Sequence, residues 1–100
     1  MNIYVDIDET IADYQPDDDR SNYNLATPIS INIDKVNKLY DEGHQITYYT
    51  ARGSLTGIDW YNITKAQLDS WGCKYHNLST GEKPAYDLLI CDKSKRIEEL

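Results

Sequence analysis

Apolar residues recur along the chain with two different periods, which predict strands and helices in alternation. Residues 2–7 are apolar on both faces, as is typical of a central strand in a parallel sheet. A helix should follow between a candidate cap at Ser30 and a stop at Gly43, and residues 44–49 should form the next strand. The apolar positions of that helix are Ile31, Ile33, Val36, Leu39 and Tyr40.

The second half of the chain continues the alternation. A helix is expected over about residues 58–71, a short strand over 73–76, a strand over 87–91 and a last helical turn over 94–99. The apolar side of the helix would be supplied by Ile58, Tyr61, Ala66, Leu68 and Trp71. Strands that alternate with helices indicate an α/β protein, here a small Rossmann-like, doubly wound, mainly parallel sheet flanked by helices. Ligands of such sheets bind at the carboxyl ends of the strands, near a topological switch point.

Chain length limits this architecture to one domain. The 100 residues are enough for a single core, and 40% hydrophobic residues with interspersed charge argue against disorder. Residues 13–29 are polar and include two prolines and the run Asp17-Asp18-Asp19, so we expect an ordered loop or short flap there. Neither this segment nor the loop after residue 50 is long enough to fold as a cap domain. Residues 1–100 should therefore form one core domain without a cap.

The net charge of the chain limits the classes of partner that we expect it to bind. The formal net charge is −7, which disfavours general binding to nucleic acid, because an acidic surface repels phosphate backbones. No apolar run is long enough to span a membrane, and residues 1–10 carry charge where a signal peptide would be apolar. Cys73 and Cys91 match no zinc spacing and are expected to be buried thiols. The sequence thus predicts a cytoplasmic protein that binds neither membranes nor nucleic acid.

Two carboxylates end the first predicted strand. Asp6 and Asp8 are separated by one residue, and side chains of alternate strand residues lie on the same side. Two negative charges in one small volume are unfavourable unless a cation lies between them. Mg²⁺ prefers hard oxygen ligands and keeps waters that a phosphate can displace. One carboxylate could then attack as a nucleophile while the other transfers protons.

Three further polar residues are expected near the same edge of the sheet. Thr50 follows the second strand, Lys83 lies in the turn before the last strand, and Asp92 comes directly after that strand. A phosphoryl-transfer site needs a nucleophile, an acid or base, a metal cage and donors to the phosphate. Together with the two acids of the first strand, these residues could supply all four.

In order along the chain, these residues resemble the four motifs of the haloacid dehalogenase (HAD) superfamily of phosphotransferases. Asp6-x-Asp8-x-Thr10 is similar to the first motif, and the other three are matched by Thr50, Lys83 and Asp92. The chain most resembles small capless HAD phosphatases of the type associated with capsule and surface-polysaccharide biosynthesis. The segments that carry this similarity are Gly43-His44, Tyr48 to Gly53, Thr64-Lys65-x-Gln67-Leu68-x-x-Trp71-Gly72 and Lys83-Pro84-x-x-Asp87-Leu88.

The resemblance implies a division of labour. Asp6 would attack phosphorus and form an aspartyl-phosphate, and Asp8 would protonate the leaving group and then activate water. Asp6, the backbone carbonyl of Asp8, and Asp92 would hold Mg²⁺ as the cofactor. The substrate-binding residues would be Thr50, Ala51, Arg52 and Lys83.

Some residues leave alternatives open. Arg52 could bind a substrate carboxylate or phosphate, or it could pair with a nearby acid. Cys91 stands where the family often has a second acid beside Asp92, a departure that bears on metal affinity and rate more than on the reaction class. Thr10 is expected to support its loop by hydrogen bonding. Structural roles are expected for the two histidines, His44 and His76.

The sequence therefore predicts a Mg²⁺-dependent phosphomonoesterase that acts on a small phosphorylated metabolite, with a sugar phosphate as the favoured class. One alternative is a phosphatase that acts on nucleotides or polynucleotide ends. Another is a non-catalytic HAD-like module that binds a metal or a partner. Without a cap the site would be open unless the flap or a neighbouring subunit covers it, so a homo-oligomer is expected.

Overall fold

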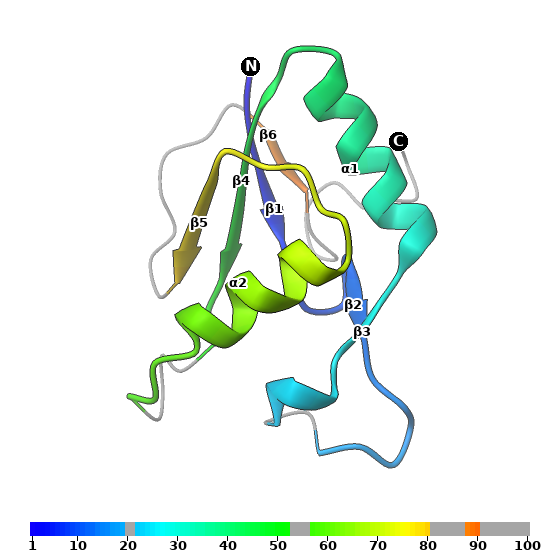
Figure 1. Cartoon of the computed structure of the whole chain (residues 1–100), viewed down its shortest axis with the longest axis vertical. Coiled ribbons are helices and arrows are strands. Elements are labelled where there is room, and N and C mark those ends of the chain that lie inside the picture. The colour runs from blue at the N-terminus through cyan, green and yellow to red at the C-terminus, as the bar shows by residue number, and fades with distance from the viewer. Residues whose placement is uncertain (20–21, 53–56, 81–87, 91–100) are drawn as a thin grey trace.

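The computed structural model describes residues 1–19, 22–52, 57–80 and 88–90. Within these residues the protein has a four-stranded parallel sheet, flanked by helices, with the strand order β5-β4-β1-β6 (Figure 1). The strands of this sheet are β1 (Asn2–Asp6), β4 (Gln45–Thr50), β5 (Asn77–Thr80) and β6 (Leu88–Ile90). The fold is therefore mixed α/β, as the alternation of strand and helix patterns predicted.

The first strand lies inside the sheet. Ile3 and Val5 are almost completely buried on one face of β1, and they pair in register with Ile46 and Tyr48 of β4. Tyr4 points to the opposite face and is half-buried. Because β4 lies on one side of β1 and β6 on the other, the prediction of a central strand is confirmed.

Two α-helices of the described residues, α1 (Ser30–Asp41) and α2 (Tyr61–Ser70), complete the core. Ile33 and Val36 of α1 and Leu68 of α2 are buried in one cluster with the apolar residues of β1 and β4. Burial of this shared apolar surface is what holds the helices on the sheet. Neither helix is long and apolar enough to cross a membrane. Gly43 follows α1 with a φ of 95°, the left-handed conformation expected of a helix stop.

The starts of both helices differ from the prediction. Ser30 is the first residue of α1, and no side chain caps the helix from the preceding position. The second helix begins at Tyr61, whose N–H donates to the carboxylate of Asp59 at 2.9 Å, a bond typical of helix starts. Ile58 therefore lies outside the helix and is exposed. Three other expected apolar positions, Ile31, Tyr61 and Ala66, are exposed as well.

The third strand was predicted four residues too early. Residues 73–75 form a link, and β5 begins only at Asn77. His76, the last residue before β5, donates its N–H to the carbonyl of Ile46 (2.8 Å) and accepts the Ile46 N–H on Nδ1 (3.0 Å). Its imidazole stacks on Tyr40 with 4.7 Å between ring centroids. His76 therefore has the structural role that was expected.

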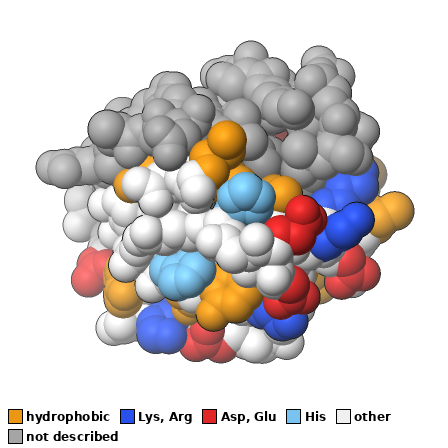
Figure 2. All heavy atoms as spheres, turned by 90° about the horizontal axis from the view of Figure 1, so that it is seen from above, with side chains coloured by type: hydrophobic (Ala, Val, Ile, Leu, Met, Phe, Trp, Pro, Cys, Tyr) orange, Lys and Arg blue, Asp and Glu red, His pale blue; other side chains and the backbone are white. Residues whose placement is uncertain are grey.

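The histidines lie at the edge of the sheet where strands begin. His44 immediately precedes β4, and His76 immediately precedes β5. Figure 2 shows this side of the molecule, with histidine side chains at the surface. Both imidazoles therefore lie away from the carboxyl ends of the strands.

Cys73, in the link before β5, is half-buried, and burial raises the pKa of its thiol to about 11. Cys91 lies outside the described residues.

The structure describes residues 13–19 and 22–29 of the polar segment predicted as a flap. It contains a small antiparallel ladder of β2 (Ala12–Asp13) and β3 (Thr27–Pro28), with the 3₁₀ turn η1 (Tyr23–Leu25) between them. The N–H of Ile29 donates to the carbonyl of Ile11 at 2.8 Å and closes the base of the flap. Figure 1 shows the flap extending beyond the end of β1, on the side toward which the strands run.

Candidate functional site

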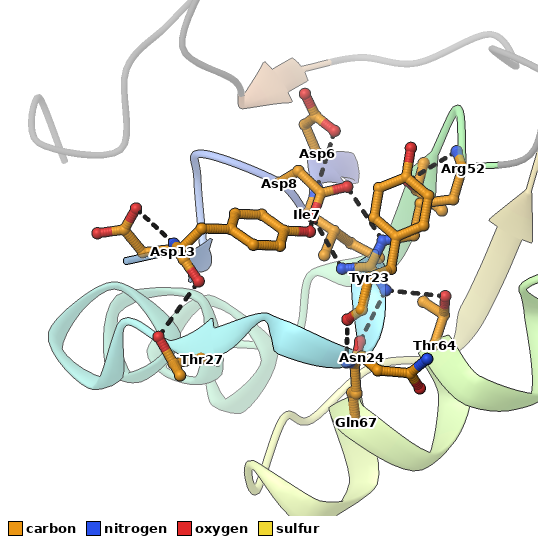
Figure 3. A network of polar contacts seen from close by, with 12 residues as sticks. Asp6, Ile7, Asp8, Asp13, Tyr23, Asn24, Thr27, Arg52, Thr64 and Gln67 are labelled. Atoms are coloured by element: carbon orange, nitrogen blue, oxygen red, sulfur yellow. Dashed lines mark hydrogen bonds and ion pairs between the residues drawn. The ribbon is translucent and has the colours of Figure 1, made fainter. Parts of the chain in front are cut away.

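The candidate site lies where β1 ends. Asp6 is the last residue of the strand, and its Oδ1 accepts the N–H of Ile7 at 2.8 Å. Asp8 lies beyond the strand, so the turn that follows, and not strand alternation, sets its direction. Figure 3 shows the Asp8 carboxylate directed toward Arg52. The two acids therefore have different partners.

A tight turn fixes the position of Asp8. The carbonyl of Ile7 accepts three N–H groups, from Thr10 (3.2 Å), Ile11 (2.9 Å) and Ala12 (3.1 Å). Glu9, at the apex, has a φ of 69°, a left-handed conformation that costs a non-glycine residue about 1 kcal/mol or more. Backbone strain of this size persists only where neighbouring bonds enforce it, and here the Ile7 carbonyl supplies three.

Thr10 supports the turn through its backbone. Its N–H donates to Ile7, and its carbonyl accepts the side-chain N–H of Asn32 on α1 at 2.9 Å. The side chain is buried, and its hydroxyl has no hydrogen-bond partner among the described residues. The expected supporting role of Thr10 is therefore carried by its main-chain N–H and carbonyl, which bond to Ile7, just after β1, and to Asn32 of α1.

Arg52 binds Asp8 through two parallel hydrogen bonds. Nε of Arg52 donates to Oδ2 at 3.0 Å, and Nη2 donates to Oδ1 at 2.7 Å. The Arg52 side chain has no exposed surface, whereas 24% of the Asp8 side chain is exposed. Of the two alternatives for Arg52, the ion pair with a nearby acid is the one observed. A bidentate pair of this kind is charge-assisted and fixes both groups in orientation.

The remaining guanidinium contacts come from α2 and the flap. Nη1 of Arg52 donates to the hydroxyl of Thr64 (3.1 Å) and to Oε1 of Gln67 (2.7 Å). The ring of Tyr23 lies over the guanidinium, with 4.7 Å from the ring centroid to Cζ. Gln67 also donates from Nε2 to the backbone carbonyl of Tyr23 at 2.7 Å. Arg52 is thus enclosed by three segments that are distant in the sequence (Figure 3).

Two flap tyrosines border the acid pair. The hydroxyl of Tyr14 donates to Oδ1 of Asp8 at 2.8 Å. Burial, and next the negative charge of Asp8, raise the pKa of Tyr14 well above its ordinary value, so this hydroxyl stays a hydrogen-bond donor over the whole physiological range. Tyr23 packs edge-on against Trp60, with 5.0 Å between ring centroids. The flap therefore contributes polar and aromatic contacts to the site.

The second strand brings Thr50 to the same edge. Thr50 ends β4, the neighbour of β1, and its buried Oγ1 accepts the N–H of Arg52 at 3.1 Å. No acceptor among the described residues takes its hydroxyl hydrogen, so this group can donate to a ligand. Ala51 follows on the exposed surface. The predicted residues Asp6, Asp8, Thr50, Ala51 and Arg52 therefore all lie at or just beyond the carboxyl ends of β1 and β4.

The other two predicted site residues, Lys83 and Asp92, lie outside the described residues. The strands before them are in place. Thr80, three positions before Lys83, ends β5, and Ile90, two positions before Asp92, pairs with Val5 of β1. Their roles stay predictions.

The oxygen atoms at the end of β1 suit a hard cation. The described residues contain no group of three or more metal-ligating side chains, and Asp92 is not among them. The turn uses the carbonyls of Ile7 and Ala12 as acceptors, and in the part of the chain that the structure describes it makes no such use of the Asp8 carbonyl. The Asp6 carboxylate and the Asp8 carbonyl are both oxygen donors of the kind that Mg²⁺ takes. They therefore fit two of the three predicted positions.

Sequence reasoning missed the residues that hold Arg52. Thr64 and Gln67 are separated by three positions, which puts both on one face of a helix, and this spacing was the available signal. Tyr14 and Tyr23 lie in the irregular flap, where no periodicity indicates a direction. Their contacts depend on how the flap folds back over the turn after β1.

Comparisons with known proteins give the fold and no function. No protein-family model and no curated protein matches the chain. Three solved chains do, among them the crystal structure of a target protein from Vibrio cholerae. It is 24% identical, with a TM-score of 0.69, and the match covers 84% of this chain and 72% of that one. The likeness shows that the two proteins share their mixed α/β architecture.

Proposed function

We propose that this protein is a Mg²⁺-dependent phosphomonoesterase of the HAD type, which hydrolyses a small phosphorylated metabolite. The fold that we propose with it is a Rossmann-like, doubly wound sheet. Strand order supports this, since the chain runs outward from β1 to β4 and β5 and then returns to add β6 on the other side of β1. Ligands of open α/β sheets bind beyond the carboxyl ends of the strands at such a reversal.

The observation that carries the proposal is the unlike environment of two acids at that reversal. Asp6 accepts a backbone N–H at the end of β1, whereas Asp8 is held by the Arg52 guanidinium and the Tyr14 hydroxyl. Acids whose environments differ in this way can take different roles in one reaction. Asp6 is the candidate nucleophile, and Asp8 is the candidate proton-transfer group.

The reaction has two steps. In the first, the Asp6 carboxylate attacks phosphorus, the bond from phosphorus to the ester oxygen breaks, and Asp8 gives its proton to that oxygen. The products are an alcohol and an aspartyl-phosphate. In the second, Asp8 takes a proton from a water that attacks phosphorus, which releases inorganic phosphate and restores both acids.

Positive charge and hydrogen-bond donors must support these steps. Thr50 and Lys83 would bind the phosphoryl oxygens. Asp6, the Asp8 carbonyl and Asp92 would hold Mg²⁺, which when bound supplies charge that lessens the repulsion between Asp6 and the substrate.

The favoured substrate class is a sugar phosphate, and this rests on the resemblance to capless phosphatases. The net charge of −7 supports a small substrate over a polyanion, because long-range repulsion grows with the charge of the ligand. Homo-oligomerisation and a cytoplasmic location stay predictions.

The test is phosphate release from p-nitrophenyl phosphate and from a panel of sugar phosphates and nucleotides, with Mg²⁺ and with EDTA. Three proteins are compared: the wild type, Asp6→Asn and Asp34→Asn. The last removes the same charge from an exposed position on α1 and serves as the matched control. We expect turnover that needs Mg²⁺, that Asp34→Asn keeps and that Asp6→Asn loses by a factor of about 1,000 or more.

Each of the other outcomes supports a different nucleophile, a different substrate class or a non-catalytic role. Turnover that survives in Asp6→Asn removes the nucleophile from the proposal. Preference for nucleotides or polynucleotide ends over sugar phosphates selects the second phosphatase class. Absence of turnover under all conditions, in a folded protein, selects the non-catalytic binding module.

A further inference from the structure

We propose that Arg52 is a positioning residue, which holds Asp8 so that a single carboxylate oxygen, Oδ2, exchanges the proton with substrate and water. This inference rests on the proposed phosphatase function. It assigns to Arg52 a different role from substrate binding, and it assigns the proton to one atom. Three features of the site carry it.

The first feature is the number of donors at each oxygen of Asp8. A carboxylate oxygen accepts about two hydrogen bonds. Oδ1 already accepts two, from the Tyr14 hydroxyl and from Nη2 of Arg52. Oδ2 accepts one from the described residues, donated by Nε of Arg52. Oδ1 is therefore filled, and Oδ2 keeps a position for a proton.

The second feature is the enclosure of the guanidinium. Four of its five N–H groups are used, two on Asp8 and one each on Thr64 and Gln67. The side chain has no exposed surface, and the ring of Tyr23 covers one face. A substrate that bound Arg52 would have to displace these contacts. Asp8, with 24% of its side chain exposed, is the member of the pair that a substrate can reach.

The third feature is the fork geometry of the pair. Only a guanidinium presents two N–H groups that match both oxygens of a carboxylate, whereas a lysine ammonium is a compact point charge. Arg52→Lys therefore keeps the charge and removes the element that sets the orientation of Asp8. Rotation of the carboxylate would then exchange Oδ1 and Oδ2 and spread the proton over directions that do not face the leaving group.

The experiment compares two esters of similar size whose leaving groups differ in their need for a proton. p-Nitrophenolate leaves readily as an anion, whereas phenolate from phenyl phosphate is a poorer leaving group. The quantity measured is kcat/KM, which reports the first phosphoryl transfer. For Arg52→Lys we expect kcat/KM to fall about 100-fold on phenyl phosphate and less than about tenfold on p-nitrophenyl phosphate, because general acid catalysis contributes about 100-fold or more.

A second pair of variants keeps the test valid if Arg52→Lys does not fold. Tyr14→Phe removes one hydroxyl from Oδ1 of Asp8, and Tyr75→Phe removes a hydroxyl that donates to the surface acid Asp69 at the same distance of 2.8 Å. The ratio of interest is kcat/KM on p-nitrophenyl phosphate divided by kcat/KM on phenyl phosphate. Tyr14→Phe should raise this ratio by about threefold or more, since one bond to the acid is lost. Tyr75→Phe should leave the ratio unchanged.

Equal losses on the two esters would overturn the proposal, because Arg52 would then not act through Asp8. A rise in KM with kcat unchanged would do the same and would assign Arg52 to substrate binding. An equal ratio in the two tyrosine variants counts against it as well. If the wild type has no Mg²⁺-dependent turnover that Asp6→Asn abolishes, the proposed function fails and this inference fails with it. If the wild type has such turnover but Arg52→Lys shows equal losses on the two esters, only this inference fails.

Discussion

Removal of the Asp8 carboxylate should destabilise the protein strongly, because it leaves a buried guanidinium without its counter-charge. In Asp8→Ala, the Arg52 side chain, which has no exposed surface, loses both charge-assisted bonds. Breaking a buried ion pair by removing one partner costs about 3–5 kcal/mol. Asp8 is 24% exposed, so water already solvates part of the pair and the lower end applies, about 3 kcal/mol.

The loss of the Tyr14 bond adds to this cost. A buried hydroxyl that loses its acceptor costs about 1 kcal/mol or more, so the free energy of unfolding should fall by about 3–4 kcal/mol in total. Domains of this size have about 5–15 kcal/mol to lose. With a urea dependence of about 2 kcal/mol per molar, the midpoint of unfolding should fall by about 1.5–2 M.

The assay is urea unfolding followed by tryptophan fluorescence, with Asp41→Ala as the matched control. Asp41 pairs with Lys74 at 2.9 Å, but both side chains are at least half exposed, so its loss should cost less than about 1 kcal/mol. Equal losses of free energy in the two variants, or an Asp8→Ala variant as stable as the wild type, would mean that the Arg52 charge is hydrated in the folded protein and would refute the expected cost.

Two further predictions follow from the surroundings of the site and of the core. Thr64→Val keeps the shape of a fully buried side chain and removes the acceptor of one Arg52 N–H, so it should lower the free energy of unfolding by about 1–3 kcal/mol; Thr27→Val, at an exposed position, should cost less. The pKa of the Cys73 thiol is raised from about 9 to about 11, so the neutral thiol stabilises the folded state fully below pH 9 and loses this contribution as the pH rises through 11. The unfolding free energy of Cys73→Ala should therefore fall less steeply than that of the wild type over this range, and parallel curves would contradict the assignment.

The parts of the fold that the sequence predicted well are those with a strong local pattern. β1, α1 and β4 each have several buried apolar residues at one period, and their observed bounds lie close to the predicted ones. β5 has only Leu78 as a large apolar residue, and the register with β4 places its start at Asn77. Because a long-range pairing sets that register, local periodicity could not find it.

Some residues of the candidate site could likewise be located from the sequence, and others could not. Asp6 and Thr50 could be located from sequence because each ends a strand whose pattern is clear. The partner of Arg52 could not, because it depends on the turn after β1. That turn requires a left-handed residue at Glu9, which the sequence pattern does not indicate. The contact between Tyr14 and Asp8 could not be predicted for the same reason.

The polar cluster around Arg52 also sets an order of events during synthesis and folding. Asp8 and Arg52 are 44 positions apart, and so are Tyr23 and Gln67. Closing a loop of this length costs about 3 kcal/mol of chain entropy, which the sheet and core must offset before these bonds can persist. During synthesis, the Asp8 carboxylate is therefore not held in its final orientation until Gln67 has emerged from the ribosome. A nascent or truncated chain that ends before α2 would carry both aspartates without the frame that orients one of them.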